Sequence, residues 1–352
     1  MPIHHKRLIK TYINHPTITY IQYIPVYEKA RKASFKLRKL VNNEDLAPKL
    51  LIDLFDKLIK PIAMYGTEIW LSPQKIEKNF IKFTDTVPAE QLHKAYLRYT
   101  LGTHKKATNL AIMGETGRVP LAIQASQTLI DYRNKILFDG DTSPILKEAL
   151  EESRNLASKK RGWYYETEEV IKLCNKEVIT DTDMPTNYNV KASLTEKYIN
   201  HWDENTNNGG KLRTMRLFKN NFRLETYLEI IKNGNERKQL TRLRLSAHRL
   251  EIERGRYKGI EIGDRKCNTC MEVEDEIHFM MRCKLYDKER KILMNMIEET
   301  APNSTNLDEK SKFIFLMSSE GEIVKQVAKT VTLMFRIREE RHKKDQQANI
   351  RC

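Results

Sequence analysis

Residues 267–283 read CNTCMEVEDEIHFMMRC and carry three cysteines and one histidine at the spacing C-x2-C-x7-H-x4-C. A C-x2-C turn places two thiolates on the same side of a tight loop, and a following His-x4-Cys pair can complete a tetrahedral shell around Zn2+. The sequence therefore predicts a metal site made of Cys267, Cys270, His278 and Cys283. Because four protein ligands leave no open position, we expect a structural ion rather than a catalytic one. The alternative is that these side chains are close in sequence only.

The segment before this cluster is basic and has the spacing of an amphipathic helix, which we expect over residues 237–254. Its apolar positions form a 3-4-3 seam, Leu240, Leu243, Ala247 and Leu250. At roughly 100° per residue, four cations fall within a narrow arc about 140° away from that seam. These cations are Lys238, Arg242, Arg249 and Arg256. We expect them to contact nucleic-acid phosphates, and the alternative is a solvated helix face.

Net charge supports a polyanionic partner, RNA or DNA. The 352 residues include 62 Lys and Arg against 47 Asp and Glu, a formal charge of +15. The excess is uneven, because residues 1–50 hold ten basic against three acidic side chains and residues 236–258 hold eight against three. Residues 139–185 are acidic, with eleven Asp and Glu against seven Lys and Arg. A charge of this kind is an argument about partners and not about fold.

Cysteine usage and hydropathy indicate where the protein functions. Three of the five cysteines lie in the one cluster, which favours a metal in a reducing compartment over a disulfide framework. No apolar run is long enough to cross a bilayer. We therefore expect an intracellular protein, nuclear or cytoplasmic, with no membrane partner.

Hydrophobic periodicity predicts a mainly α fold with few strands. Helical spacing begins at Tyr27, and residues 1–25 could be a loose arm or an edge strand. A second apolar stripe starts at Leu50 and should end or kink at Pro61. Further helices are expected over 88–102, 108–117, 120–138, 143–156, 217–233 and 237–254, with a last one through Ile323 and Ile337. Turn signals at 181–185 and 207–210 suggest a break between domains.

Several short motifs together resemble the carboxy-terminal region of reverse transcriptases from non-long-terminal-repeat retrotransposons. In the carboxy-terminal half they are KLRT at 211–214, LFKN at 217–220, AHRLEIERGRY at 247–257, the cysteine pair at 267 and 270, EDEIHF at 274–279, Cys283 and Tyr286. Upstream they are KARKA at 29–33, LRKL at 37–40, LFDKLIKP at 54–61, MYGTEIW at 64–70, LAIMGE at 110–115 and GRVPL at 117–121. The resemblance covers about residues 27–290.

That resemblance implies a helical thumb and connector ending in a zinc knuckle that grips RNA or DNA. The expected regions are an amino-terminal extension (1–26), a thumb-like helical region (27–160), a polar, acidic connector (161–210), basic helices with the knuckle (211–292) and a helical basic tail (293–352). We expect multi-helical packing followed by a small Cys3His knuckle and carboxy-terminal helices.

Polymerase chemistry needs carboxylates that hold two metal ions, and the family carries them in an Asp-Asp turn. The chain contains no Asp-Asp dipeptide, and its paired acids Asp139/Asp141 and Asp181/Asp183 are in turn-like contexts. We therefore expect no catalytic residues and no polymerase or endonuclease activity of its own. Two alternatives remain, a scaffold that binds a protein partner and a truncated form of an active RNA-directed DNA polymerase.

Overall fold

A computed structural model describes residues 16–70, 87–174, 189–208, 210–304 and 306–350. Within these ranges the chain is mainly helical and forms no β-strand, only the isolated bridges Thr116–Leu224 and Lys266–Val273. The mainly α prediction is therefore confirmed. Contacts divide the chain into two compact units. Unit 1 comprises residues 1–39, 54–96 and 119–202, and unit 2 comprises residues 40–53, 97–118 and 203–352.

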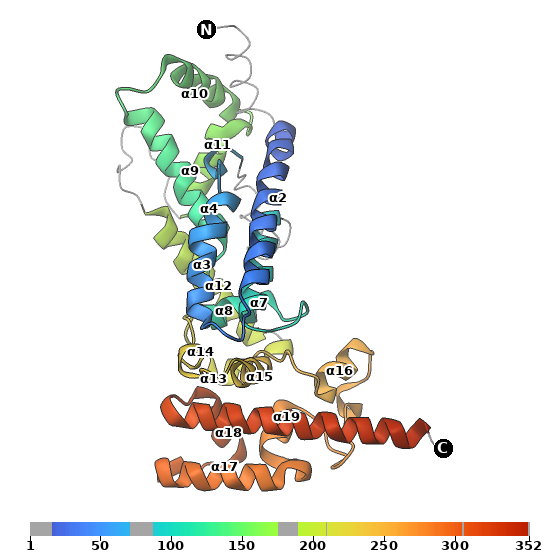
Figure 1. The fold of residues 1–352 in the computed structure, drawn as a ribbon. Helices are drawn as coiled ribbons and strands as arrows, with labels where there is room; N and C mark the ends of the chain where they lie inside the picture. The colour runs from blue at the N-terminus through green and yellow to red at the C-terminus, as the bar shows by residue number, and fades with distance from the viewer. Residues whose placement is uncertain (1–15, 71–86, 175–188, 209, 305, 351–352) are drawn as a thin grey trace. The chain divides into compact units, whose positions relative to one another are not determined.

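Unit 1 is built from helices whose ends are set by local capping. Its elements are α2 (Pro16–Leu40), η1 (Phe55–Ile59), α4 (Lys60–Ala63), α5 (Thr67–Trp70), the first part of α7 (Pro88–Thr100), α9 (Leu121–Phe138), α10 (Pro144–Ala157), α11 (Gly162–Leu173) and most of α12 (Val190–Asn208). Helix α10 begins as predicted, because the Ser143 side chain accepts a hydrogen bond from the Leu146 amide and Pro144 occupies the first turn. Helices α9, α10 and α11 pack on one another (Figure 1).

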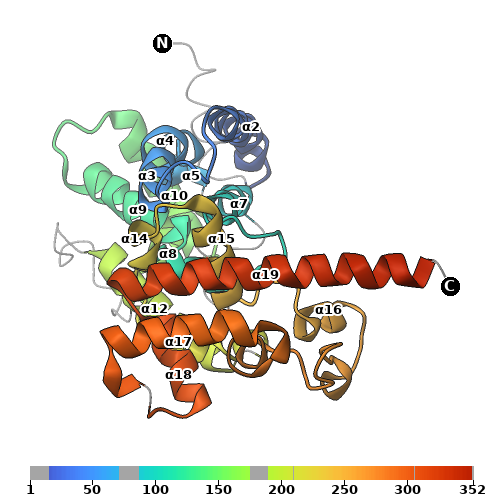
Figure 2. The same cartoon turned by 60° about the horizontal axis from the view of Figure 1, so that its bottom comes forward.

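Unit 2 contains α3 (Pro48–Leu54), α8 (Asn109–Thr116), η3 (Gly210–Leu212), α13 (Met215–Phe218), α14 (Tyr227–Ile230), α15 (Gly234–Arg244), α16 (Glu251–Tyr257), η4 (Ile262–Asp264), η5 (His278–Arg282), η6 (Lys284–Tyr286), α17 (Asp287–Thr300), η7 (Pro302–Ser304), α18 (Glu309–Ser318) and α19 (Gly321–Ile350). Helix α19 packs against α14, α15, α17 and α18 (Figures 1 and 2). Phe279 stacks on Phe335 of α19 at 4.6 Å between ring centroids, so the metal-site segment joins this core.

The single helix predicted over residues 237–254 is wrong. Helix α15 ends at Arg244 and α16 begins at Glu251. Between them Ser246 adopts the left-handed φ of 47°, and the Ala247 amide donates to the Arg242 carbonyl at 2.8 Å. The apolar seam is real, since Leu240, Leu243, Ala247 and Leu250 are all buried, but it is not carried by one helix.

Three other local expectations change. Residues 16–25 are helical rather than an arm or strand, while residues 1–15 lie outside the described ranges. By contrast, the stripe from Leu50 does change near Pro61, because the helix becomes the π-helix η1 before this proline and α4 ends two residues after it, at Ala63. The helix expected over 217–233 is replaced by the short α13 and α14, and the range 161–210 contains α11 and α12. The turn expected at 181–185 lies outside the described residues. No helix in the described part of the chain is long and apolar enough to span a bilayer.

Candidate metal centre and basic patch

The loop that carries the first two cysteines is folded tightly by its own backbone. The Cys267 amide donates to the Glu272 carbonyl at 2.7 Å, and the Met271 amide donates to the Cys267 carbonyl at 2.9 Å. Met271 has a φ of 58°, and the bridge between Lys266 and Val273 closes the base of the loop. This geometry places the thiols of Cys267 and Cys270 on one side of the turn.

The four predicted ligands come together. Their donor atoms all lie within 4.8 Å of one another. The Cys283 Sγ is 3.7 Å from the Cys267 Sγ and 3.8 Å from the Cys270 Sγ. With Zn–S bonds of about 2.3 Å, the edge of a tetrahedron is about 3.8 Å. The sulfur spacing therefore fits tetrahedral thiolate coordination, and these residues can hold a metal ion.

His278 is oriented as a ligand in this cluster. Its side chain is fully buried, and its Nδ1 lies 3.1 Å from the Glu272 Oε2. Its Nε2 is buried and has no hydrogen-bond partner among the described residues. A metal-ligating histidine commonly donates its other ring N–H to a carboxylate, which fixes the tautomer and the ring orientation. Glu272 is therefore placed to orient the His278 ring for a metal, a contact that the sequence pattern did not indicate.

The thiols of Cys267 and Cys283 differ in acidity. A hydrogen bond from Cys283 lowers the pKa of Cys267 to about 3, whereas the same pairing and burial raise the pKa of Cys283. Burial lowers the pKa of His278, but its contacts with Cys267 and Glu272 outweigh this and raise it overall. Close thiolates repel one another in the absence of a cation, so a bound metal would favour deprotonation of the remaining ligands.

A buried carboxylate holds the metal-site segment to two other parts of unit 2. Glu276, two residues before His278, is 0% exposed. It accepts hydrogen bonds from the Ser246 Oγ at 2.8 Å and pairs with the His248 Nε2 at 2.9 Å and the Arg213 Nη2 at 2.6 Å. Burial raises the pKa of Glu276, but the contacts with His248 and Arg213 lower it to about 2. The carboxylate is thus ionised and fully paired.

A second buried pair ties the loop to α19. Arg338 donates from Nε to the Glu274 Oε1 at 2.8 Å and from Nη2 to the Glu274 Oε2 at 2.6 Å. The Glu251 amide at the start of α16 donates to the same Glu274 carboxylate at 2.6 Å. Bidentate Arg–carboxylate pairs fix geometry as well as charge. The loop after Cys270 is therefore anchored to both α16 and α19.

The four cations predicted to contact phosphates do not share one helix face. Lys238 is paired with Glu44, and its stem lies against Gly102. The Arg242 Nε donates to the Gly102 carbonyl at 2.9 Å. Arg256 lies 3.4 Å from Glu253, and Arg249 is exposed. The four cations therefore differ in how readily they could contact a ligand. Lys238 is held most closely by its partner Glu44, and the exposed Arg249 is held least.

Three of these four cations belong instead to a patch built from distant segments. We define the basic patch as Lys106, Lys211, Arg242, Arg249, Arg256 and the aromatic ring of Tyr257. The Lys106 Nζ lies 3.8 Å from the Tyr257 ring centroid, and the Lys211 Nζ donates to the Lys106 carbonyl at 2.7 Å. The Tyr257 side chain is nevertheless 48% exposed.

The charges of the patch lower the pKa values of three groups within or beside it, His104, Lys211 and Arg242. Burial lowers the pKa of His104, and the charges of Lys211 and Arg242 lower it further. Burial likewise lowers the pKa of Lys211, and neighbouring Arg256 and Lys106 add to that effect while Glu253 opposes it. Burial followed by the charge of Arg249 lowers the pKa of Arg242, whereas Glu44 and Glu339 oppose the shift. The sequence could not indicate this grouping, because Lys106 and Lys211 are far from residues 242–257.

Comparisons with known proteins do not identify the chain. No family model, no curated protein and no solved structure matches it.

Proposed function

We propose that the chain is a nucleic-acid-binding protein in which a structural Zn2+ ion on Cys267, Cys270, His278 and Cys283 supports a phosphate-contacting basic patch. The observation that carries this proposal is the patch itself. It gathers five cations from three segments: Lys106 and Lys211 lie over an exposed tyrosine ring, and burial and neighbouring positive charge lower the pKa values of Lys211 and Arg242. A phosphate backbone relieves such repulsion, and a tyrosine face offers a base a stacking surface.

Acidic neighbours offset this charge only in part. Glu253 is 1% exposed, and the same carboxylate oxygen lies 3.0 Å from the Arg213 Nη1 and 3.4 Å from the Arg256 Nη2, so it is shared between Arg213 and the patch. Glu44 pairs with Lys238, which we therefore exclude from the contact surface. The resemblance of residues 27–290 to the carboxy-terminal region of retrotransposon reverse transcriptases supports the same ligand class, and we infer that RNA or DNA is held without catalysis by this chain.

The metal has a supporting role in this proposal. A bound Zn2+ ion would supply folding free energy and no reactive position, because all four ligands come from the protein. The loop that carries the ligands also carries Glu276. Glu276 bonds to Ser246 and His248, and these two residues lie just before Arg249 in the chain. The metal site would therefore hold the chain segment that presents patch cations.

The test is equilibrium binding of a fluorescent RNA or DNA oligonucleotide at several salt concentrations. If all five cations neutralise phosphates, log K should fall against log salt with a slope of about −4.5 for duplex DNA and about −3.5 for a single strand. The double variant Lys106→Glu/Arg249→Glu should bind much more weakly with a shallower slope. Lys288→Glu/Lys291→Glu, on the exposed face of α17, is the charge-matched control. Equal binding by both double variants and the wild type would remove the patch as the contact surface, whereas salt-insensitive capture of a protein would favour a scaffold.

A further inference from the structure

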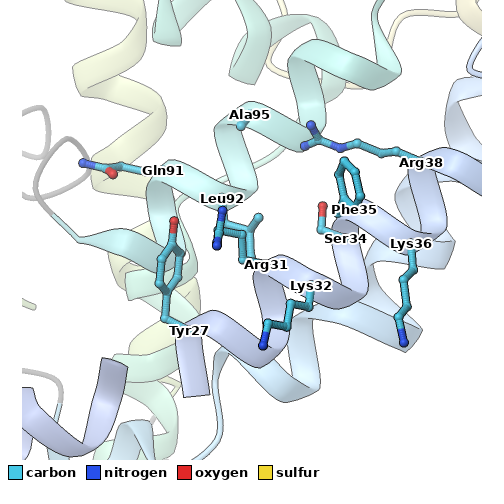
Figure 3. A pocket seen from close by; sticks show the side chains of 10 residues that line it. All are labelled: Tyr27, Arg31, Lys32, Ser34, Phe35, Lys36, Arg38, Gln91, Leu92 and Ala95. Carbon is cyan, nitrogen blue, oxygen red and sulfur yellow. The ribbon is translucent and has the colours of Figure 1, made fainter. Parts of the chain in front are cut away.

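Unit 1 contains a groove between α2 and α7 that the features described above do not use. Its volume is about 660 Å³, and it is lined from α2 by two aromatic and four basic side chains. Figure 3 shows Tyr27, Arg31 and Phe35 extending from α2 toward α7, where Leu92 and Ala95 form the opposite wall. The lining therefore combines apolar floor, aromatic faces and positive charge.

Charge in the groove is one-sided. Arg31, Lys32, Lys36 and Arg38 line it, and none of the lining residues in the described part of the chain is acidic. Glu28, one turn before Arg31 on α2, pairs with Arg31 at 2.8 Å. That pair is exposed, and exposed ion pairs contribute little to stability, so a phosphate can displace the carboxylate at small cost.

Two further observations point to a ligand. Phe35 is 59% exposed although it lies in the groove, and the Lys39 Nζ lies 4.7 Å from its ring centroid. Ser34 is 2% exposed, yet its Oγ has no hydrogen-bond partner among the described residues. A buried hydroxyl without a partner costs free energy that a ligand acceptor would recover.

We propose that this groove binds a short single-stranded segment of nucleic acid, with a base stacked on Phe35 and phosphates held by Arg31, Lys32 and Lys36. Tyr27 and Phe35 are eight residues apart on one helix, so their rings are separated by about 12 Å along the axis. That distance corresponds to about four stacked nucleotides at 3.4 Å each. Duplex DNA keeps its bases paired inside the helix, so only a single strand presents base faces to Phe35. The inference rests on the proposed nucleic-acid binding and adds a second site in the other unit.

The experiment compares a fluorescent 15-nucleotide oligothymidine with a duplex of equal length on the full chain. Phe35→Ala should weaken oligothymidine binding about tenfold, in line with measured costs of removing a stacking ring, and should leave duplex binding unchanged. Lys32→Glu/Lys36→Glu should weaken oligothymidine binding more than the control Lys29→Glu/Lys57→Glu, whose side chains are exposed in unit 1 but do not line the groove. Phe35→Trp should retain affinity, and its added fluorescence should be quenched when the oligonucleotide binds.

Each outcome has one meaning. If Phe35→Ala and Lys32→Glu/Lys36→Glu bind oligothymidine like the wild type, or if the control pair loses as much affinity, the groove is not the site. If the groove variants lose affinity while Lys106→Glu/Arg249→Glu does not, the groove is a binding site and the basic patch in unit 2 is not. If the wild type binds neither oligonucleotide, both proposals fall. Circular dichroism of each variant confirms folding, and Phe35→Trp provides a folded variant that still reports on stacking.

Discussion

Removing the metal should destabilise unit 2 and leave unit 1 intact. The perturbation is a strong chelator, or the ligand substitution Cys283→Ser, which removes the sulfur that lies 3.7 and 3.8 Å from its two neighbours. Without the ion, the buried Nε2 of His278 and the crowded thiols remain in the core without a common partner. We therefore expect local loss of structure around residues 265–286.

The size of the effect follows from binding linkage. A ligand that binds only the folded state stabilises it by about 2.7 kcal/mol at 100 times its Kd and about 4.1 kcal/mol at 1,000 times its Kd. Unit 2 contains about 190 residues, for which 1 kcal/mol shifts Tm by about 2–4 °C. Chelation should accordingly lower the Tm of unit 2 by about 5–16 °C under these conditions.

Differential scanning calorimetry with and without chelator measures the shift, and elemental analysis measures the metal. Hydrogen exchange should lose protection in the metal loop and in α16, and in α19 near Arg338, which is bonded to Glu274. Protection in α9, α10 and α11 should not change. Cys174→Ser, outside the cluster, should keep one equivalent of metal. Finding no metal in the purified protein, together with an unchanged Tm on chelation, would refute the reasoning.

Two further substitutions test how the site is supported. Glu272→Gln should weaken metal affinity about 10–100-fold while the fold is kept, because it removes the carboxylate that orients His278. A competition titration with a chromophoric chelator measures the affinity. Unchanged affinity would contradict this role of Glu272. Glu276→Gln should destabilise the protein by about 3–5 kcal/mol in urea unfolding, because it removes the anion that pairs with the buried His248 and one of the two anions that pair with Arg213. The exposed control Glu298→Gln should change stability by no more than about 0.5 kcal/mol, and an equal effect of both substitutions would argue against the network.

Local signals in the sequence predict local structure well. The metal ligands lie within 17 residues, so the loop that unites them needs only backbone bonds of its own. Helix α8 likewise has the bounds that its caps dictate, since the Thr108 side chain accepts from the Ala111 amide and Gly117 takes a left-handed φ of 61°. The Thr108 hydroxyl and the conformational freedom of Gly117 each act within one turn of the helix, so the sequence alone is enough to predict these ends.

Tertiary contacts decided what the sequence could not. The 3-4-3 apolar spacing continues through Ser246 and His248, and neither is a strong helix breaker. The helix nevertheless ends because both side chains reach Glu276, which is 30 and 28 residues away. Lys238 is removed from the predicted cation set by Glu44, which is 194 residues away. Periodicity describes one element at a time and carries no information about such partners.

The Glu276 network would connect a bound metal ion to the proposed nucleic-acid binding. Glu276 lies two residues before His278, and the segments it holds carry patch cations: His248 precedes Arg249, and Arg213 follows Lys211 by two residues. A carboxylate fixed at a metal loop thus sets the positions of two charges that come from distant parts of the chain. Closely placed cations repel, and they remain together only if the backbone beneath them is held rigidly. Under the proposed function the metal and the basic patch are therefore coupled, because release of the ion would loosen the loop that carries Glu276 and let these cations move apart.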